Sequence, residues 1–350
     1  MNIVHLEDER WDSGLAHYAV TLAAEQARRG QNVSVWGLEN SPVLKDAAAR
    51  GLATRGWRSG VLGWSQIPAL RRDLARFKPD VVNAHTGSAH ARALLIAPKG
   101  AAVVRTRGDA RSPQKNILTR VTAARTAALI AANTTIKFQL ESVFPGILAH
   151  FVPQGIEGPS ETAPLPGVPR IGMIARLDPV KGHAVLIDAA MSLKSELPAL
   201  KVSCAGEGRL LESLRSSLAA RGLSQTVEFI GRVADKWSFL ASCRIGVAAS
   251  TGSEAVSRAA LEWMAAGRPL IATKVGGLAD LVEDGATGLL IPPGDPSALA
   301  AAVRSLVRDP ARAERMGRAA RTRWENKFSL APFYAATQKV YDQAIDSLSR

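Results

Sequence analysis

Two glutamates lie eight residues apart in the stretch STGSEAVSRAALEWMAAGRPLIA, residues 250–272. The pattern predicts that a strand ends near residue 250 and that a helix begins at about Val256. Helical rise would separate Glu254 from Glu262 by roughly 12 Å, a distance that suits the two ends of a nucleotide sugar. The helix start would offer a diphosphate its positive dipole end and the unpaired N–H groups of Val256, Ser257 and Arg258.

Carboxylates accept hydrogen bonds from pairs of neighbouring hydroxyl groups. Glu262 is therefore a candidate for holding a ribose, and Glu254 for holding a hexose. A simpler interpretation stays open, in which Glu254 only stabilises the helix N-terminus and Glu262 is a solvated helix residue.

A second candidate element is the loop ARLDPVKGH, which places Arg176 and Lys181 just after an apolar run. A guanidinium and an ammonium at such a position are suited to clamp a diphosphate and to stabilise its charge as it leaves. The alternative is that both are surface cations paired with Asp178 and Asp188.

The elements that must position these residues alternate along the chain. Short apolar runs, interpreted as strands, are separated by amphipathic helical stretches, which predicts an α/β fold with parallel sheets covered by helices on both faces. Four prolines in EGPSETAPLPGVP interrupt the pattern. We predict a first domain at 1–158, a proline-rich linker at 159–169, a second domain at 170–328, and a final helix, 329–350, that packs back on the first domain.

Charge and composition limit the classes of binding partner and the cellular location that we expect. Residues 51–137 hold 15 Lys or Arg against three acids, a net charge of +12 out of +13 for the chain, which favours an anionic partner over a merely well-solvated surface. The first residues, MNIVHLEDERW, do not form a signal peptide, and no run of 18 apolar residues occurs, so we expect a cytoplasmic protein. Cys204 and Cys243 lie in apolar runs and are expected to be reduced, with no metal or redox role.

The order of several motifs resembles glycosyltransferase family 4, whose members have the GT-B fold. In the second half these motifs are ARLDPVKG, AGEG, FIGRV, SEAVSRAALEWMAAGRPLIA and GGLADLVEDGATGLLIPPGD. In the first half, DSGLAHYAVTLAAEQARRGQNVSV, PDVVNAHT and FVPQGIE are similar to the family's glycine loop and helix, its fourth strand, and the end of its first domain. The resemblance covers nearly the whole chain and implies two doubly wound Rossmann-like domains that face a cleft.

The resemblance implies roles for the residues above. Glu254 would contact the transferred sugar, and Glu262 the donor ribose. Arg176 and Lys181 would bind the donor diphosphate, and Val233 would lie near the base.

Gly14 would let the backbone approach the reacting centre. Family members retain the anomeric configuration without a metal, so we expect neither a metal nor a cofactor. We expect front-face attack, with the leaving diphosphate helping to deprotonate the acceptor hydroxyl. The acidic triplet at residues 7–9 is interpreted as a polar loop at a strand end.

The sequence departs from the family after the fifth strand, where Gly108 and Asp109 stand in place of the usual histidine and its neighbour. Asp109 is a candidate for contacting a hydroxyl, and Arg105 and Arg107 for binding a phosphate or carboxylate of the acceptor. The alternative is that the two arginines pair with nearby acids. His85 is either an acceptor contact or a structural residue that binds a neighbouring loop.

The predicted function is sugar transfer from a UDP- or GDP-linked donor to an acceptor. The basic first domain predicts an anionic glycan, lipopolysaccharide-core or lipid-linked acceptor of cell-envelope synthesis, reached at the inner face of the cytoplasmic membrane. Trp57 and Trp64 beside arginines suit a headgroup interface, with core packing as the alternative. The rival functions are a nucleotide-sugar epimerase of the same fold and a non-catalytic polyanion-binding protein; nucleic acid is not an expected partner.

Overall fold

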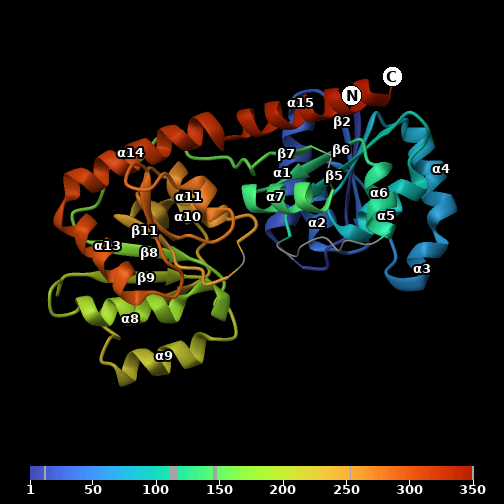
Figure 1. Ribbon diagram of the computed structural model, residues 1–350. Helices are drawn as coiled ribbons and strands as arrows, with labels where there is room; N and C mark the ends of the chain where they lie inside the picture. The colour runs from blue at the N-terminus through green and yellow to red at the C-terminus, as the bar shows by residue number, and fades with distance from the viewer. Residues whose placement is uncertain (12, 110–116, 145–147, 253, 349–350) are drawn as a thin grey trace. The chain divides into compact units, whose positions relative to one another are not determined.

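The computed structural model describes residues 1–11, 13–109, 117–144, 148–252 and 254–348. The chain divides into two compact units, unit 1 comprising Met1–Gly155 with Leu330–Arg350, and unit 2 comprising Ile156–Ser329. Each unit is built on a parallel sheet with helices packed against it (Figure 1). The segment 159–169, predicted as a linker, lies within unit 2, and the final helix belongs to unit 1.

Unit 1 contains a seven-stranded parallel sheet in the order β3-β2-β1-β4-β5-β6-β7. Its strands are β1 Asn2–Glu7, β2 Asn32–Leu38, β3 Ala53–Trp57, β4 Val81–Ala84, β5 Ala102–Arg107, β6 Ala128–Ala131 and β7 Ala149–Phe151. Its helices are α1 Gly14–Arg28, α2 Pro42–Ala49, α3 Gly60–Ser65, α4 Ile67–Phe77, α5 Gly87–Ile96, α6 Ile117–Ala124, α7 Thr134–Val143 and α15 Leu330–Leu348. Helices α4 and α5 pack together, while α15 contacts α1 and β5.

Unit 2 contains a six-stranded parallel sheet in the order β10-β9-β8-β11-β12-β13. Its strands are β8 Arg170–Ile174, β9 Lys201–Ala205, β10 Val227–Gly231, β11 Ile245–Ala248, β12 Leu270–Thr273 and β13 Gly288–Ile291. Its helices are the short 3-10 helix η1 Pro179–Lys181, α8 His183–Leu193, α9 Leu211–Ala220, α10 Lys236–Ala241, α11 Arg258–Ala265, α12 Leu278–Leu281, α13 Pro296–Arg308 and α14 Pro310–Lys327.

Helices cover both faces of the unit 2 sheet, as the alternating sequence pattern predicts. One buried cluster joins the strands to α8, α9 and α13, and another joins them to α10, α11 and α12 (Figure 1). Because both faces are covered, the strands are short continuous apolar runs such as LIAT in β12. Because all six strands run parallel, their carboxyl ends meet at one edge of the sheet, where the loops carry the candidate residues.

One strand and the position of one tryptophan differ from the sequence prediction. Strand β3, with the sequence ATRGW, was not predicted, because its first residues are exposed and give no apolar run; pairing with β2 makes it the edge of the sheet. Trp57 at its end is fully buried, so core packing and not a headgroup interface describes this residue. No helix of the described residues is both long enough and apolar enough to cross a membrane.

Candidate functional site

The strand order of unit 2 reverses direction between β8 and β11, and such switch points are where doubly wound sheets bind their ligands. The loop after β8 supplies Lys181, and the loop after β11 supplies Glu254. These two side chains form an ion pair, in which the Lys181 ammonium donates to Glu254 Oε1. Ser250, which the sequence analysis did not select, also donates its hydroxyl to Glu254 Oε1.

The backbone around Lys181 is fixed by its neighbours. Asp178 caps the 3-10 turn η1 by accepting from the N–H of Val180 at 3.3 Å, and the carbonyl of Val180 accepts from Thr251 N at 2.8 Å. Gly182 has φ 77°, and a Cβ there would overlap the carbonyl of Ala249 at the end of β11. The two loops are therefore locked together, which holds Lys181 opposite Glu254.

Arg176 lies on the same loop with its side chain exposed. The pairing with aspartates that the sequence left open does not occur for Lys181, whose partner is Glu254. Asp188 pairs instead with Arg221. The side chain of Arg176 makes no hydrogen bond or ion pair with the residues that the structure describes.

Helix α11 begins at Arg258, two residues later than predicted. Val256 and Ser257 precede the helix, so of the three predicted N–H groups only that of Arg258 belongs to its first turn. Glu254 lies outside the helix, and the roughly 12 Å separation worked from helical rise does not describe the pair.

Glu262 is buried on α11 and is held by two cations. Lys236 Nζ contacts Glu262 Oε1 at 2.7 Å, and Arg258 Nε contacts the same oxygen at 3.0 Å. The solvated-residue interpretation of Glu262 is therefore wrong. Lys236 begins α10 after β10, and its position 26 residues before Glu262 gave the sequence analysis no spacing signal.

Two glycines of the sheet make room for the tryptophan of α11. Trp263 of this helix is fully buried, and its indole lies over Gly172 of β8 and Gly246 of β11. A Cβ at either glycine would overlap the indole ring. The two glycines thus let the helix approach the switch point closely, which positions Glu262.

Two further residues line this part of unit 2. His183 begins α8 beside Lys181, and burial together with the Lys181 charge lowers the pKa of His183 to about 4. Neither ring nitrogen of His183 has a hydrogen-bond partner within the described part of the chain. Val233, after β10, is half-buried and packs against the cluster that contains Trp263; its contact with a base stays a prediction.

The predicted acceptor residues of unit 1 gather at the carboxyl ends of β4 and β5. His85 is fully buried and shares a hydrogen bond of 3.0 Å between its Nε2 and Nδ1 of His5. His5 in turn binds Gln26 at 2.7 Å. A structural interpretation of His85 accounts for these contacts, and its contact with an acceptor stays a prediction.

Arg105 and Arg107 both pair with Asp109. Arg107 NH2 lies 2.8 Å from Asp109 Oδ1, and Arg105 NH2 lies 3.9 Å from Oδ2. Arg105 also donates to the carbonyls of Ala84 and Thr106. Burial and the neighbouring Arg107 charge lower the pKa of Arg105 to about 10, so it stays cationic at neutral pH. The pairing alternative thus describes both arginines in this structure.

Gly14 is the first residue of α1, and Ser13 caps this helix by accepting from the N–H of Ala16 at 3.1 Å. Among Glu7, Asp8 and Glu9, Glu7 is buried, and burial together with the Glu9 charge raises its pKa well above the usual value. Within the described ranges no three His, Cys, Asp or Glu side chains are arranged to hold a metal ion.

Two doubly wound parallel-sheet units, each with the strand order of a dinucleotide-binding fold, define the GT-B class of proteins. Residues 161–323 match the family model described as glycosyl transferases group 1, and residues 13–157 match the one described as glycosyltransferase family 4. The two matched ranges together take in most of the chain, and they support a glycosyltransferase of the family 4 type.

Individual relatives agree with this assignment. A D-inositol 3-phosphate glycosyltransferase from Streptomyces avermitilis is 29% identical over 324 residues, which cover 84% of this chain and 65% of that protein. A glycogen synthase from Mycobacterium tuberculosis is 35% identical over 180 residues, which cover 51% of this chain and 43% of that protein. The chain thus spans less than two thirds of either relative. The solved structure of HepE from Anabaena, in complex with UDP and glucose, has the same fold, with a TM-score of 0.81, 20% identity, and coverage of 98% of this chain and 99% of that chain.

Proposed function

We propose that this protein transfers a hexosyl unit from a UDP- or GDP-linked sugar, bound by unit 2, to a hydroxyl group of an acceptor bound by unit 1. The observation that carries the proposal is the meeting of Lys181 and Glu254 at the β8–β11 switch point, with Arg176 exposed on the same loop. Cations there suit a diphosphate, and a carboxylate beside them suits sugar hydroxyls.

The hydrogen bonding of the two glutamates leaves room for sugar hydroxyls. Lys181 and Ser250 both contact Glu254 through Oε1. Lys236 and Arg258 both contact Glu262 through Oε1. Among the described residues no hydrogen bond uses Oε2 of either side chain, so each keeps an acceptor oxygen for hexose and ribose hydroxyls respectively.

The proposed reaction forms a bond between the acceptor oxygen and the anomeric carbon while the bond from that carbon to the diphosphate oxygen breaks. The hydroxyl proton passes to the leaving phosphate oxygen on the same face of the sugar, so the configuration is retained. Lys181 and Arg176 stabilise the charge that develops on the diphosphate. Neither a metal nor a cofactor takes part.

A thermal-shift screen of UDP-, GDP- and ADP-sugars tests donor binding, because a ligand that binds only the folded state raises the melting temperature. We expect one nucleotide class to stabilise the protein. Glu262→Gln should weaken binding of that donor by about tenfold, because the amide oxygen still accepts a hydrogen bond but no longer carries a charge. Glu212→Gln, an exposed carboxylate on α9, serves as the matched control and should bind normally. A wild-type protein that no nucleotide sugar stabilises contradicts the proposal.

The stereochemistry and the metal dependence have their own test. NMR of the product should show the anomeric configuration of the donor, and a chelator should leave the rate unchanged. An inverted product, or activity lost with the chelator and restored by a divalent cation, contradicts this part of the proposal.

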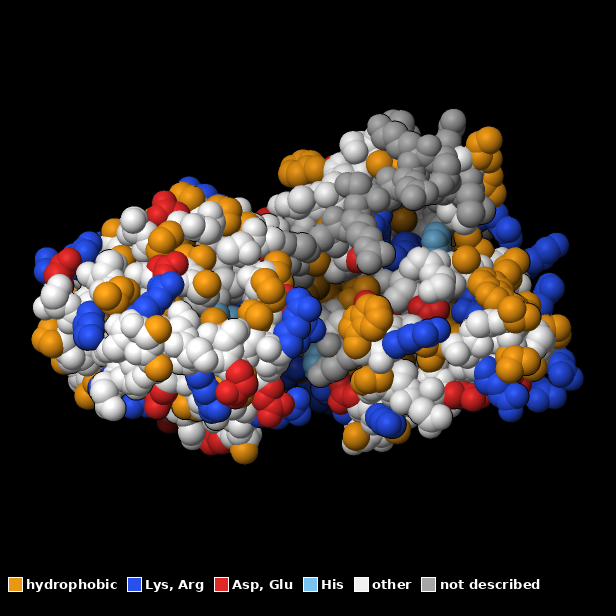
Figure 2. Space-filling view, turned by 90° about the horizontal axis from the view of Figure 1, so that it is seen from below, with side chains coloured by type: hydrophobic (Ala, Val, Ile, Leu, Met, Phe, Trp, Pro, Cys, Tyr) orange, Lys and Arg blue, Asp and Glu red, His pale blue; other side chains and the backbone are white. Residues whose placement is uncertain are grey.

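An anionic acceptor at a membrane surface is supported by the surface of unit 1. Three large apolar side chains of α3 are exposed, with exposed fractions of 85% for Val61, 59% for Leu62 and 44% for Trp64; we call them the α3 patch. Arg58, Arg71, Arg72 and Arg76 are exposed before it and on α4. Figure 2 shows hydrophobic side chains gathered on the right-hand part of this face, with Lys and Arg beside them. The name of the Streptomyces relative includes an anionic compound, D-inositol 3-phosphate, which supports the same acceptor class.

Exposed apolar side chains together with exposed arginines suit the boundary of an anionic bilayer, where both burial and charge stabilise binding. Val61→Asp should reduce sedimentation with anionic vesicles, and raised salt should reduce it further. Val168→Asp changes an exposed valine of unit 2 and is the matched control, expected to bind as the wild type does. Equal binding by the two variants would show that the α3 patch is not the contact. Such a surface would support our proposal of a lipid-linked or lipopolysaccharide-core acceptor of the cell envelope.

A further inference from the structure

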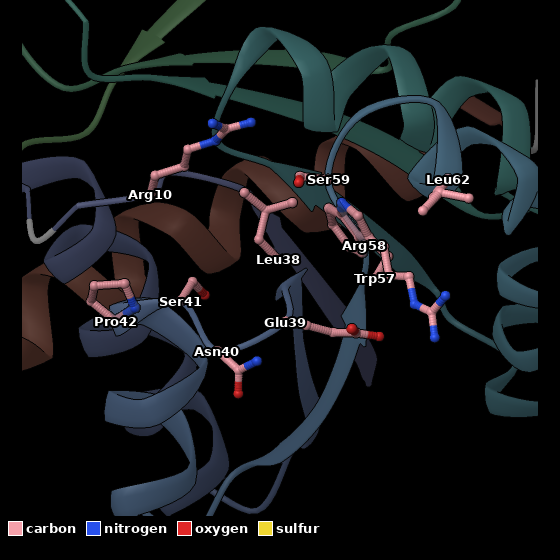
Figure 3. A pocket seen from close by; sticks show the side chains of 10 residues that line it. All are labelled: Arg10, Leu38, Glu39, Asn40, Ser41, Pro42, Trp57, Arg58, Ser59 and Leu62. Atoms are coloured by element: carbon pink, nitrogen blue, oxygen red, sulfur yellow. The ribbon is translucent and has the colours of Figure 1, made fainter.

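Unit 1 contains a pocket of about 560 Å³ at the ends of β2 and β3, and its charged side chains do not converge on one point. Arg10 lies at one side of the pocket, and Glu39 and Arg58 lie at the other (Figure 3). In unit 2, by contrast, two buried hydroxyl groups follow one another toward a single carboxylate, that of Glu254.

The first of these hydroxyls belongs to Ser250, in the loop after β11. Ser250 is 3% exposed and donates to Glu254 Oε1, the same oxygen that Lys181 contacts. Lys181 is 24% exposed and has a long, flexible side chain, whereas a serine side chain has few rotamers to lose. The short buried hydroxyl therefore fixes the orientation of the carboxylate better than the ammonium does.

Ser250 is in turn held by the end of the neighbouring strand. Thr273, the last residue of β12, is fully buried and donates its hydroxyl to the carbonyl of Ser250 at 2.7 Å. On the other side, Thr251 N donates to the carbonyl of Val180 in the loop after β8 at 2.8 Å. The backbone at Ser250 is thus tied to both strands that flank β11 in the sheet.

The backbone of Glu254 is held by the loop after β12. Gly277 N donates to the carbonyl of Glu254 at 2.7 Å. Gly276 has φ 47°, and a Cβ there would overlap the same carbonyl. With its backbone and its Oε1 both fixed, Glu254 presents the other carboxylate oxygen, Oε2, which makes no hydrogen bond in the described part of the chain.

We propose that Ser250 and Thr273 are positioning residues, which orient Glu254 so that Oε2 accepts hydrogen bonds from hydroxyl groups of the transferred sugar. The contact of Glu254 with that sugar rests on the proposed function. An ionised carboxylate oxygen only accepts hydrogen bonds, so it recognises a sugar hydroxyl as a donor. A nucleotide sugar that lacks the hydroxyl facing Oε2 therefore loses a charge-assisted hydrogen bond.

Deoxy sugars test this role, because they separate the orientation of Glu254 from general stability. The probes are UDP-glucose, its monodeoxy analogues and UDP, or GDP-mannose, its monodeoxy analogues and GDP if the thermal-shift screen selects GDP. In the wild type, at least one deoxy analogue should bind about 10- to 150-fold more weakly than the parent sugar nucleotide; we call this ratio the deoxy penalty. A wild type that binds every deoxy analogue as tightly as the parent overturns the proposal.

Ser250→Ala should change sugar recognition and spare the nucleotide. The parent sugar nucleotide should bind about tenfold more weakly, and the deoxy penalty should shrink below about threefold, because Glu254 no longer holds the orientation that the hydroxyl needs. Binding of UDP or GDP alone should stay within about twofold of the wild type. An unchanged deoxy penalty overturns the role of Ser250.

Ser203→Ala is the matched control. Ser203 is a fully buried serine of β9 whose hydroxyl donates to Oε1 of Glu228 at 2.6 Å, which is the same kind of contact away from the switch point. Both variants should lower the melting temperature by about 2 to 4 °C, but Ser203→Ala should keep the deoxy penalty of the wild type. Equal deoxy penalties in Ser203→Ala and Ser250→Ala would show a merely structural effect and overturn the proposal.

Two substitutions of Thr273 test the second hydroxyl. Thr273→Val removes the hydroxyl with little change of shape and should reproduce the small deoxy penalty of Ser250→Ala. Thr273→Ser keeps the hydroxyl and should restore the wild-type penalty. Equal penalties in these two variants overturn the role of Thr273.

The proposed function and the positioning role fail in different ways. If the wild type binds no nucleotide sugar, the proposed function fails, and sugar recognition by Glu254 fails with it. Thermal unfolding of Ser250→Ala, Glu254→Gln and the double variant then decides whether Ser250 holds Glu254: we expect the double variant to lose at least about 2 °C less than the sum of the single losses, and additive losses overturn the contact. If the donor binds and Ser250→Ala keeps the deoxy penalty, the positioning role alone fails.

Discussion

Replacing Lys181 by methionine tests the donor site most directly. The substitution removes the ammonium from Glu254, whose side chain is 7% exposed, while Lys181 itself is 24% exposed. Breaking a fully buried ion pair costs about 3 to 5 kcal/mol. Because Lys181 is partly solvated and Ser250 still donates to Glu254, we expect a smaller loss of about 1 to 3 kcal/mol in the free energy of unfolding.

In Lys181→Met, the loss of stability and the loss of donor affinity should respond differently to a second substitution at Glu254. For a unit of this size the loss corresponds to a fall of roughly 2 to 12 °C in melting temperature. Donor affinity should fall by about 10- to 150-fold, the value of one charge-assisted hydrogen bond of about 1.5 to 3 kcal/mol. Adding Glu254→Gln removes the unpaired carboxylate, so the double variant should regain stability while donor binding stays weak.

The assays are thermal unfolding without ligand and titration with the nucleotide sugar that the screen identifies. Lys201→Met is the matched control, since Lys201 begins β9 at the opposite edge of the sheet and its side chain, among the described residues, donates only to the carbonyl of Gln225. The reasoning is refuted if Lys181→Met binds the donor within twofold of the wild type, or if Lys201→Met causes equal losses.

Three further perturbations test the packing and the buried polar groups. In Gly246→Ala the new methyl group should overlap the indole of Trp263 and destabilise unit 2 by about 1 to 3 kcal/mol, measured by denaturant unfolding. An unchanged unfolding midpoint would show that the indole can move away without cost. Burial lowers the folded pKa of both His5 and His183 from 6.5 to about 4, so the unfolded chain binds more protons between these values. Stability should therefore fall as pH drops from 6.5 toward 4, by up to about 1.4 kcal/mol per pH unit for each histidine, and replacing either by glutamine should flatten the slope. Tyr341→Phe removes the hydroxyl that accepts from Nδ2 of Asn83 in β4 at 2.7 Å, so this buried amide group loses that partner. We expect a loss of about 1 to 3 kcal/mol in the free energy of unfolding and faster hydrogen exchange along α15, and unchanged exchange would contradict this anchoring role.

The class of fold and the loops of the candidate donor site could be predicted from the sequence alone. Apolar runs, helical stretches and turn residues are local signals, and they predicted the two parallel-sheet units and the loops that carry Arg176, Lys181 and Glu254. These local signals are weakest for a strand that forms mainly because it pairs with a neighbouring strand. The exposed residues of β3 become a strand only because β2 pairs with them, and no local pattern announces that.

Tertiary structure decided which charges meet. Lys181 and Glu254 are 73 residues apart, and they pair because β8 lies next to β11 in the sheet. Lys236 reaches Glu262 for the same kind of reason, since strand order and not spacing brings α10 beside α11. The glycines under Trp263 look like ordinary strand residues until the helix above them is seen. Contacts between distant segments depend on the order of strands, and a single sequence read residue by residue carries no direct record of that order.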